Sequence, residues 1–233
     1  MTGIIIVDKP SDWTSFDVCA KIRGTVRALT GEKKIKVGHG GTLDPLATGV
    51  LPVFIGREFT KLVSSCEMSD KEYVCVLRLG VTTDTQDISG NVLQTREVTV
   101  TRGDVEAALT SFRGDIMQVP PMYSAIQVNG QRLYDIARRG GEAVREPRPI
   151  TIYESELLSG SDNLYTLRFV VSKGTYIRTL CHDIGETLGC GGTMESLRRT
   201  RVGQWRVENA VTMDDIARYA VNGELEEHLL RVV

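Results

Sequence analysis

The sequence predicts an α+β fold, with a mixed, mainly antiparallel central sheet and helices that flank it. Two segments, 71–80 and 165–174, alternate apolar and polar residues with the period of a strand that has one buried face. Two others, 104–114 and 175–189, repeat apolar residues every three or four positions, as a helix with one buried face does. Strands and helices interspersed along the chain, with no internal repeat or coiled coil, are typical of this class.

The N-terminal elements follow the same two patterns. Residues 3–10, "GIIIVDKP", contain an apolar run that predicts a strand. A helix is predicted over 15–30, with Ser15 as a possible cap. Helical steps separate the apolar residues of this segment, which are Phe16, Val18, Ile22, Val26 and Leu29.

A glycine-rich stretch then carries one carboxylate, Asp44, within "VGHGGTLDPLATGVLPV", residues 37–53. An acid before a proline commonly caps a helix. Here Gly49 and Pro52 leave room for barely one turn, and Pro45 favours extended backbone at the acid. The flanking apolar runs predict buried strands. We therefore expect strand, tight loop and strand, with the acid at the rim of a sheet, where functional residues tend to lie.

The middle of the chain is expected to leave the sheet. In the helix of 104–114, Asp104 is the expected cap and Gly114 the expected stop. Residues 115–150 combine prolines, short strand-like pieces and a short helix at 133–137. We interpret 115–150 as a long excursion from the sheet.

Composition places the chain among ordinary globular proteins and predicts one domain over residues 1–233. It has 41% hydrophobic and 25% charged residues, which is typical of a soluble protein. The first apolar run meets Asp8 and Lys9 at once, which fits neither a signal peptide nor a membrane span, so a cytoplasmic protein is expected. The five cysteines form no CxxC pair, and there are three histidines, so we expect neither a disulfide framework nor a metal site.

The charge is distributed unevenly along the chain. The formal net charge is −2, and residues 207–233, expected to form an acidic helical segment, carry six acidic residues against two arginines. A basic cluster is more often a solvated face than a binding site, but three clusters near expected loops make a phosphate-binding surface plausible. These clusters are Lys33, Lys34 and Lys36; Arg132, Arg138, Arg139, Arg145 and Arg148; and Arg198, Arg199, Arg201 and Arg206.

Catalytic patterns narrow the possible chemistry. The sequence has no Walker A loop, no GxSxG, no HExxH and no GxGxxG. A carboxylate on a loop needs a group that keeps it ionised and in place, and an arginine can do both. Arg178 is the candidate, on the first turn of the helix of 175–189, which Thr175 can cap. On its own, an arginine there would more often be a solvated helix residue.

Four motifs, in this order and spacing, resemble those of the TruB-type tRNA pseudouridine synthases over roughly residues 3–206. They are "GHGGTLDPLATGVLPV", "KEYVCVLRLGVTTDTQDISG", "VPPMYSAIQVNGQRLYDIARRG" and "KGTYIRTLCHDIG". The resemblance implies the catalytic fold of pseudouridine synthases and the isomerisation of a uridine, position 55 in the T-arm of tRNA, so that C5 replaces N1 at the sugar. An acid on a rigid loop suits this reaction, because the target nucleotide must be flipped out of folded RNA.

The resemblance also assigns roles to particular residues. Asp44 would be the nucleophile, paired with Arg178, and Tyr73 would stack on the flipped base. Tyr176 and Leu197 would complete the pocket, and His39 would help to displace the base and fill its place in the stack. Taken alone, Tyr73 and Leu197 would be core residues. Whether the acid attacks the sugar, attacks the base or first removes a sugar proton stays open.

The expected partner is the T-arm stem-loop of tRNA, bound by a monomer. Residues 120–148 correspond to the part of the family that closes over RNA. Isomerisation needs no electrons or energy source, so no cofactor and no metal are implied. The residues expected to contact RNA are Lys9, Arg132, Arg138, Arg139, Arg145 and Arg148.

The chain departs from the family pattern in two places. Phe59 stands in "GREFTK", where family members commonly have a small residue. The C-terminal PUA-type domain usual in bacterial members is expected to be absent.

Two alternatives to a tRNA pseudouridine synthase stay open. One is a non-catalytic RNA-binding or RNA-folding module, and the other is an enzyme that acts on ribosomal or messenger RNA.

Overall fold

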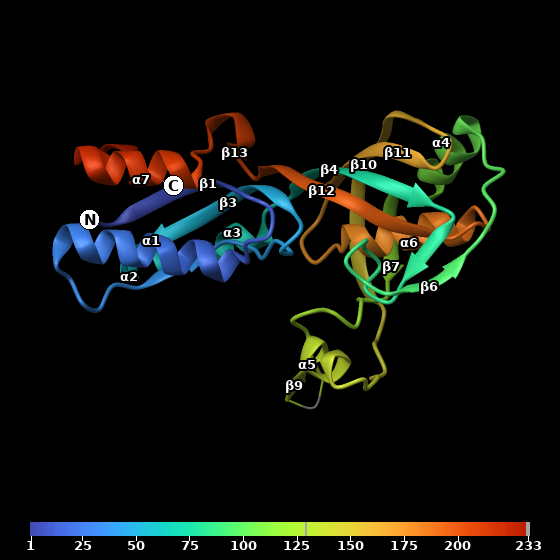
Figure 1. Ribbon diagram of the computed structural model, residues 1–233, viewed down its shortest axis with the longest axis horizontal. Helices are drawn as coiled ribbons and strands as arrows, with labels where there is room; N and C mark the ends of the chain where they lie inside the picture. The colour runs from blue at the N-terminus through green and yellow to red at the C-terminus, as the bar shows by residue number, and fades with distance from the viewer. Residues whose placement is uncertain (129, 232–233) are drawn as a thin grey trace. The chain divides into compact units, whose positions relative to one another are not determined.

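The structure is a computed structural model that describes residues 1–128 and 130–231. The chain divides into two compact units (Figure 1). The first unit combines both ends of the chain, Met1–Tyr73 and Leu197–Val233, and the second is Val74–Ser196. Two strands, β4 (Lys71–Leu79) and β12 (Gly192–Val202), run from one unit into the other.

The sheet of the first unit has the strand order β1-β3-β12-β4, with β2 paired to β3 and β13 paired to β12. Strands β1 and β3 are antiparallel, whereas β3 and β12 are parallel. The remaining elements of this unit are, in chain order, β1 (Gly3–Lys9), α1 (Ser15–Thr30), β2 (Val37–His39), β3 (Thr48–Ile55), α2 (Arg57–Thr60), α3 (Val63–Met68), β13 (Trp205–Arg206), η1 (Val207–Asn209), α7 (Met213–Asn222) and η2 (Leu225–His228).

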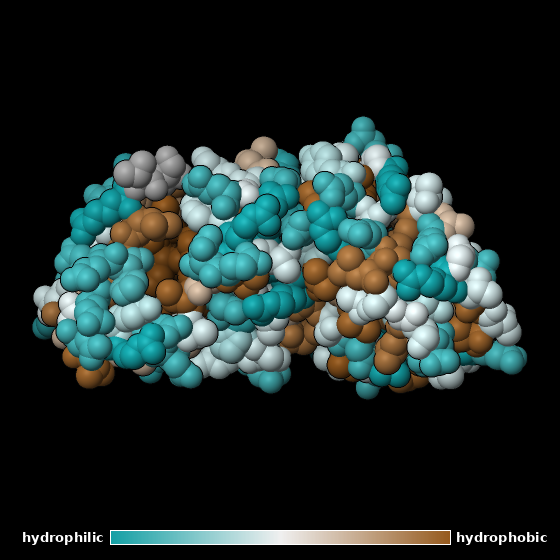
Figure 2. All heavy atoms as spheres, turned by 90° about the horizontal axis from the view of Figure 1, so that it is seen from above, coloured by the Kyte–Doolittle hydropathy of each residue, from teal (hydrophilic) through white to brown (hydrophobic). Residues whose placement is uncertain are grey.

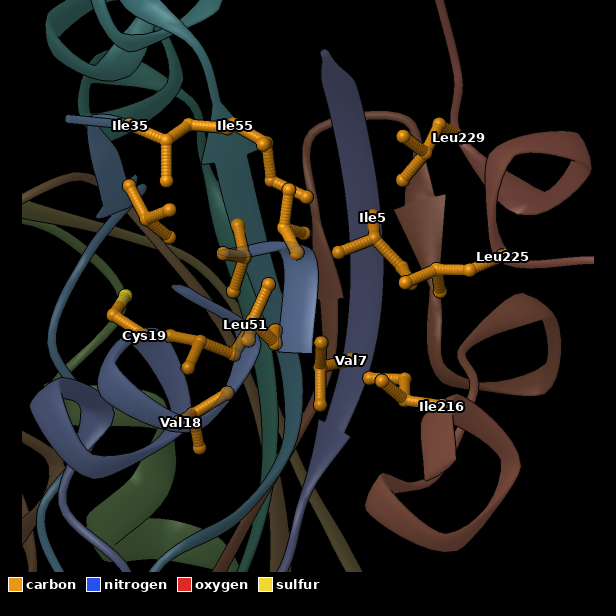
Figure 3. Close-up of a cluster of buried hydrophobic side chains, with 14 residues drawn as sticks. Ile5, Val7, Val18, Cys19, Ile35, Leu51, Ile55, Ile216, Leu225 and Leu229 are labelled. Carbon is orange, nitrogen blue, oxygen red and sulfur yellow. The ribbon is translucent and has the colours of Figure 1, made fainter. Parts of the chain in front are cut away.

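Strands β1 and β3 are buried along nearly their whole length, which is why their sequences are almost continuously apolar. Figure 3 shows the cluster that forms on one side of these strands, where α1, α7 and η2 contribute side chains. Ile5 and Leu51 lie at its centre, with Val18 from α1 and Ile216 from α7 packed against the strands. This core fixes the strands that carry the loop described below.

The second unit has the strand order β12-β4-β11-β10-β7. Both β10 with β11 and β10 with β7 are antiparallel. Its remaining elements are β5 (Val81–Thr83), β6 (Val92–Thr95), α4 (Arg102–Ser111), β7 (Gly114–Gln118), β8 (Gln127–Val128), β9 (Gln131–Arg132), α5 (Leu133–Arg138), β10 (Arg148–Ser161), β11 (Leu164–Val171) and α6 (Ile177–Thr187).

The predicted fold class is confirmed, because helices flank a mixed sheet whose pairings are mainly antiparallel. In β4 burial alternates residue by residue, as the sequence predicts. The excursion expected at 115–150 contains β7, β8, β9 and α5, and in Figure 1 β9 and α5 project away from the sheet of this unit. The segment from 207 onward contains η1, α7 and η2.

The caps expected for two helices were wrong. Helix α1 is capped by Thr14 rather than Ser15, whose side chain bonds to another part of the chain. Helix α4 is capped by Thr101, and Asp104 occupies the third helical position of a capping box. In both helices the carboxylate of the aspartate three residues after the threonine accepts a hydrogen bond from the threonine backbone N–H, which completes the capping box.

Other expectations about the helices also need correction. Thr175 does not cap α6, because its hydroxyl donates to Ser172 O at 3.0 Å and the N-cap is Tyr176. Of the apolar residues spaced by helical steps in α1, Val18, Ile22 and Val26 are buried, whereas Phe16 and Leu29 are 65% and 42% exposed. Helix α4 ends at Ser111, before Gly114 begins β7 with a positive φ.

The surface is mixed in character. On the face drawn in Figure 2, hydrophilic residues are spread over the whole view, with hydrophobic residues in separate groups between them. Among the residues that the structure describes, no helix has both the length and the apolar character needed to cross a membrane.

Candidate active site

Asp44 lies at the start of a β-turn in the loop that joins β2 to β3. Its carbonyl oxygen accepts a hydrogen bond from Ala47 N at 3.0 Å, with Pro45 in the second position of the turn, where proline is favoured. The acid is half-buried, while its neighbours Leu43 and Ala47 are buried. The loop therefore has strand on each side and anchors on both flanks of the acid, as predicted from its glycines and prolines.

The chain around the start of α1 holds this loop from one side. Ser15 Oγ accepts a hydrogen bond from Leu43 N at 2.9 Å and donates to Leu43 O at 3.2 Å. Asp12 N donates to Pro45 O at 2.8 Å. These bonds leave little freedom at the residues on either side of Asp44.

Lys9 has a different position from the one expected of an RNA contact. Its side chain is completely buried, and its ammonium group donates to Pro10 O at 2.8 Å, Trp13 O at 2.6 Å and Pro45 O at 3.1 Å. Burial lowers the pKa of Lys9 to about 8, although the charges of Asp12 and Asp44 act in the opposite direction. A buried ammonium that ends on carbonyl oxygens cannot reach a phosphate, so in this structure Lys9 holds the loop.

Two further buried cations lie near the loop. Arg199 donates to Gly41 O, Thr42 O and Val50 O. Lys71 donates to Glu67 O at 3.0 Å and Ser69 O at 2.7 Å, at the C-terminal end of α3, and burial lowers its pKa to about 8.

The third basic cluster of the sequence is therefore not one exposed surface. Arg199 is buried, Arg198 grips Asp8 with both terminal nitrogens at 3.1 and 2.8 Å, and Arg201 pairs with Asp70 at 2.8 Å. Arginines on a strand alternate between its two faces, and here both faces meet protein partners.

His39 ends β2 and precedes Asp44 on the same loop. Its Nδ1 is buried and has no hydrogen-bond partner among the described residues. Burial, with the Arg199 charge as a second cause, lowers the pKa of His39 below its usual value. The lowered pKa favours the neutral form of the ring.

Tyr73 and Leu197 lie on neighbouring strands of the first unit, β4 and β12. Both are buried, at 7% and 8% exposure. Their burial is consistent with a place in the hydrophobic core and with a place in the wall of a pocket, because both bury the same kind of residue.

Arg178 lies in the second unit, on the first turn of α6 as predicted, but it is not a solvated helix residue. It is 6% exposed, and its Nη2 donates to Tyr123 O at 2.8 Å. Its Nη1 lies 3.8 Å from the carboxylate of Asp87, which is also buried. The guanidinium is thus held between an acid and the backbone of the 120–148 segment.

Asp87 is a candidate site residue that the sequence analysis missed. Its Oδ1 accepts hydrogen bonds from Thr85 Oγ1 at 2.8 Å, from Ser89 N at 3.0 Å and from Ser89 Oγ. The signal was present in "TTDTQDISG", where an acid stands among short hydroxyl residues that can bond to it. The family resemblance included that stretch in one of its motifs but assigned no role to Asp87.

Tyr176 precedes Arg178 and is fixed by a pair of hydrogen bonds with Gln118. Tyr176 N donates to Gln118 Oε1 at 2.9 Å, and Gln118 Nε2 donates to Tyr176 O at 3.1 Å. The Arg178 guanidinium lies 5.9 Å from the centre of the Tyr176 ring, within the range of a cation–π contact.

The arginines of the 120–148 segment are mostly exposed. Arg132 and Arg138 lie 5.8 and 5.4 Å from the centre of the Tyr134 ring, and both are exposed, as are Arg139 and Arg148. Arg145 differs, because it donates to Pro120 O at 3.1 Å at the base of the segment. Exposed guanidinium groups beside an aromatic ring can contact phosphates and bases.

The expected site residues thus fall into two groups. His39, Asp44, Tyr73 and Leu197 belong to the first unit, and Tyr176 and Arg178 to the second. The first group offers a half-buried carboxylate on a fixed loop, able to act as a nucleophile or a base. The second offers a fixed guanidinium. Within the described ranges 1–128 and 130–231, no group of three or more potential ligands is arranged to hold a metal ion.

The fold is that of the pseudouridine synthases. In one solved structure, of a Cbf5–Nop10–Gar1 complex, the matching chain superimposes with a TM-score of 0.73 and 31% identity over 97% of this chain. A second, of an H/ACA RNP bound to a substrate RNA containing 2′-deoxyuridine, gives a TM-score of 0.72 and 28% identity over 98% of this chain. This chain spans 57% and 58% of the length of those two chains.

The chain belongs to the TruB family of pseudouridine synthases. Residues 27–177 match the TruB family pseudouridylate synthase N-terminal domain, and residues 178–233 match the tRNA pseudouridylate synthase B C-terminal domain. The tRNA pseudouridine synthase B of Clostridium kluyveri is 45% identical over 92% of this chain and 72% of its own length. That of Pseudomonas fluorescens is 49% identical over 93% of this chain and 68% of its own length.

Proposed function

We propose that this chain converts uridine to pseudouridine in tRNA, at the uridine of the T-arm, with Asp44 as the nucleophile. The observation that carries the proposal is the single carboxylate of the Asp44 loop, half-buried and fixed on both flanks in a chain of this family. The relatives called tRNA pseudouridine synthase B support tRNA as the substrate.

The reaction breaks the bond between uracil N1 and sugar C1′ and forms a bond between C5 and C1′. N1 gains a proton and C5 loses one, so atoms and electrons balance within the substrate. The Asp44 carboxylate begins this sequence by attacking the sugar, by attacking the base or by removing a sugar proton. All three routes need an ionised carboxylate in a fixed position, and the anchors around the loop supply that position.

Arg178 would pair with Asp44 and hold it as an anion beside the sugar. The fixed position of its guanidinium supports this role. The ion pair with Asp87 and the hydrogen bond to Tyr123 O set the orientation of this planar group. Tyr73 would stack on the flipped base, and Tyr176 and Leu197 would complete the pocket.

His39 would take the place of the displaced base. A neutral ring whose buried Nδ1 has no partner among the described residues loses little by leaving its position. A neutral imidazole also stacks between bases without carrying a charge into the helix. The exposed arginines of the 120–148 segment would hold the RNA through its phosphates.

The test incubates the chain with unmodified tRNA and maps pseudouridine along the product. The expected result is a single new pseudouridine, at the T-arm uridine. Modification only in ribosomal or messenger RNA would contradict the substrate, and RNA binding without any product would favour the non-catalytic alternative.

Asp44→Asn is the decisive variant. Because the amide keeps the shape and loses the nucleophile, turnover should fall at least about a thousandfold while the Kd for tRNA stays within about threefold. Arg178→Lys belongs in the same assay, since a point charge should replace the planar fork poorly. Appreciable turnover by Asp44→Asn would refute the proposed chemistry.

A further inference from the structure

Arg199 lies on β12 in the first unit and is only 1% exposed. Its Nε donates to Val50 O at 2.8 Å, its Nη2 to Gly41 O at 3.0 Å and its Nη1 to Thr42 O at 3.4 Å. Gly41 and Thr42 precede Asp44 in the chain, and Val50 follows it. One guanidinium therefore ties the two stems of the Asp44 loop to each other.

The backbone of Arg199 contacts the same loop. Strand β12 runs parallel to β3, with Arg199 opposite Gly49. Gly49 has a φ of +105°, and a Cβ built on it would lie 2.1 Å from Arg199 O. The main chain of β12 is thus in close contact with the stem that follows Asp44. The Arg199 side chain also bonds to the stem that precedes Asp44.

The space that Arg199 fills does not require a charged side chain. Among the described residues it forms no ion pair, since its donors end on carbonyl oxygens. Burying an unpaired charge is costly, and an apolar side chain of similar size would fill the same volume without that cost. Hydrogen bonds from a charged donor are stronger than neutral ones, which suits a bridge that must hold two segments in register.

The charge also reaches other groups around the loop. After burial, the Arg199 charge is the next cause of the lowered pKa of both His39 and Lys71. A positive charge with no carboxylate partner beside the loop favours an anion on the loop. Asp44 is the carboxylate that the loop carries.

We propose that Arg199 is a positioning residue for the isomerisation, which bridges the two stems of the Asp44 loop through charge-assisted hydrogen bonds and so fixes the carboxylate for reaction. The proposal rests on the proposed role of Asp44. Arg199 acts through the loop and does not touch the substrate, so its loss should slow the chemical step more than it weakens RNA binding.

The test compares Arg199→Met, Arg199→Lys and the control Arg201→Met. Arg201 stands two residues further along the same strand, so it shares the face of Arg199, but it bonds to Asp70 and Gly203 O and not to the loop. Single-turnover rates and Kd values for tRNA are measured well below the melting temperature of each variant. Circular dichroism establishes that each variant is folded under the assay conditions.

Arg199→Met should reduce the single-turnover rate at least about a hundredfold, as expected for a displaced catalytic group, with a Kd within about threefold of the unsubstituted chain. Arg199→Lys should be at least about tenfold faster than Arg199→Met, because an ammonium keeps the charge and part of the bonding. Arg201→Met should stay within about threefold in both quantities, since it leaves the bridge intact.

Three results would overturn the inference: an unchanged rate in Arg199→Met, an equal loss in Arg201→Met, or an Arg199→Lys rate no higher than that of Arg199→Met. Asp44→Asn in the same assay separates this failure from failure of the proposed function. If Asp44→Asn is inactive while Arg199→Met is normal, only the Arg199 bridge is wrong. If Asp44→Asn is active, the proposed function itself fails.

Discussion

The Asp44 loop and the 120–148 segment are built in opposite ways. The loop receives bonds from β1, from α1 and from β12, and buried cations lie around it. Within the 120–148 segment, β9 and α5 project from the sheet of their unit (Figure 1). Most arginines of this segment are exposed. Leu133 is the large apolar side chain that it buries most completely.

This difference matches two different demands. A reacting group must be held within a fraction of an ångström of its productive position. A group that contacts RNA phosphates needs charge and reach, because phosphate contacts tolerate adjustment and depend on salt. We infer that the chain concentrates rigidity where bonds would change and leaves the binding segment with local attachments only.

The largest effect should come from one substitution made in both regions, Gly49→Ala and Gly140→Ala. Both glycines have positive φ, +105° and +74°. A Cβ at Gly49 would meet the backbone of Arg199, whereas one at Gly140 would meet nothing within 4 Å. Gly49→Ala should therefore lower the single-turnover rate at least about a hundredfold.

Gly140→Ala supplies the matched control for that substitution. The strained φ should cost about 1 kcal/mol of local stability, and turnover should stay within about twofold, because no neighbour has to move. Both rates are measured from the pseudouridine formed in unmodified tRNA when the reaction is stopped at successive times. Equal losses in the two variants would break the contrast between the regions.

An intermediate effect is expected from Arg132, Arg138 and Arg139, each changed to alanine. Each should weaken tRNA binding and reduce the slope of log K against log salt by about one if it contacts a phosphate, with the rate at saturating enzyme unchanged. Arg102→Ala is the control, because that arginine pairs with Glu106 on the exposed face of α4 in the same unit. Salt slopes equal to that of the control would mean that this cluster is a solvated face and does not contact phosphates.

The smallest effect concerns the pH dependence of stability. Burial lowers the pKa of Lys71 in the folded chain from 10.5 to about 8. Between these values the unfolded chain binds more protons at this group, so its contribution to the unfolding free energy rises with pH, by about 1–3 kcal/mol in all. Urea denaturation at pH 8 and at pH 10 should show a larger gain for the unsubstituted chain than for Lys71→Met. An identical gain would mean that Lys71 titrates normally.

The sequence alone was sufficient for the features that depend on local pattern. Alternation predicted β4 with Tyr73 on its buried side, and the glycines and prolines around Asp44 predicted a loop between strands. These features follow from backbone preferences and from one buried face, and both leave a periodic trace in the residues.

The buried cations left no such trace. Lys9 and Arg199 look like surface residues in the sequence, because lysine and arginine are almost never fully buried unless a partner awaits them. Their partners are carbonyl oxygens, which any residue can supply, so no residue type near them signals the site. Arg178 was located on its helix, but its partner Asp87 stands far from it in the chain and could be recognised only after folding.

The hydrogen bonds of Arg199 on β12 depend on the order in which the chain is synthesised. Arg199 bonds to residues that precede it by 149 to 158 positions, so the clasp on the Asp44 loop joins an early part of the chain to a late one. Proteins emerge from the ribosome N-terminus first, and contacts of such separation form only after the later segment is available. A nascent chain that already contains Asp44 therefore cannot form these bonds until residue 199 has left the ribosome, and under the proposed role of Arg199 catalytic competence would arrive late in translation.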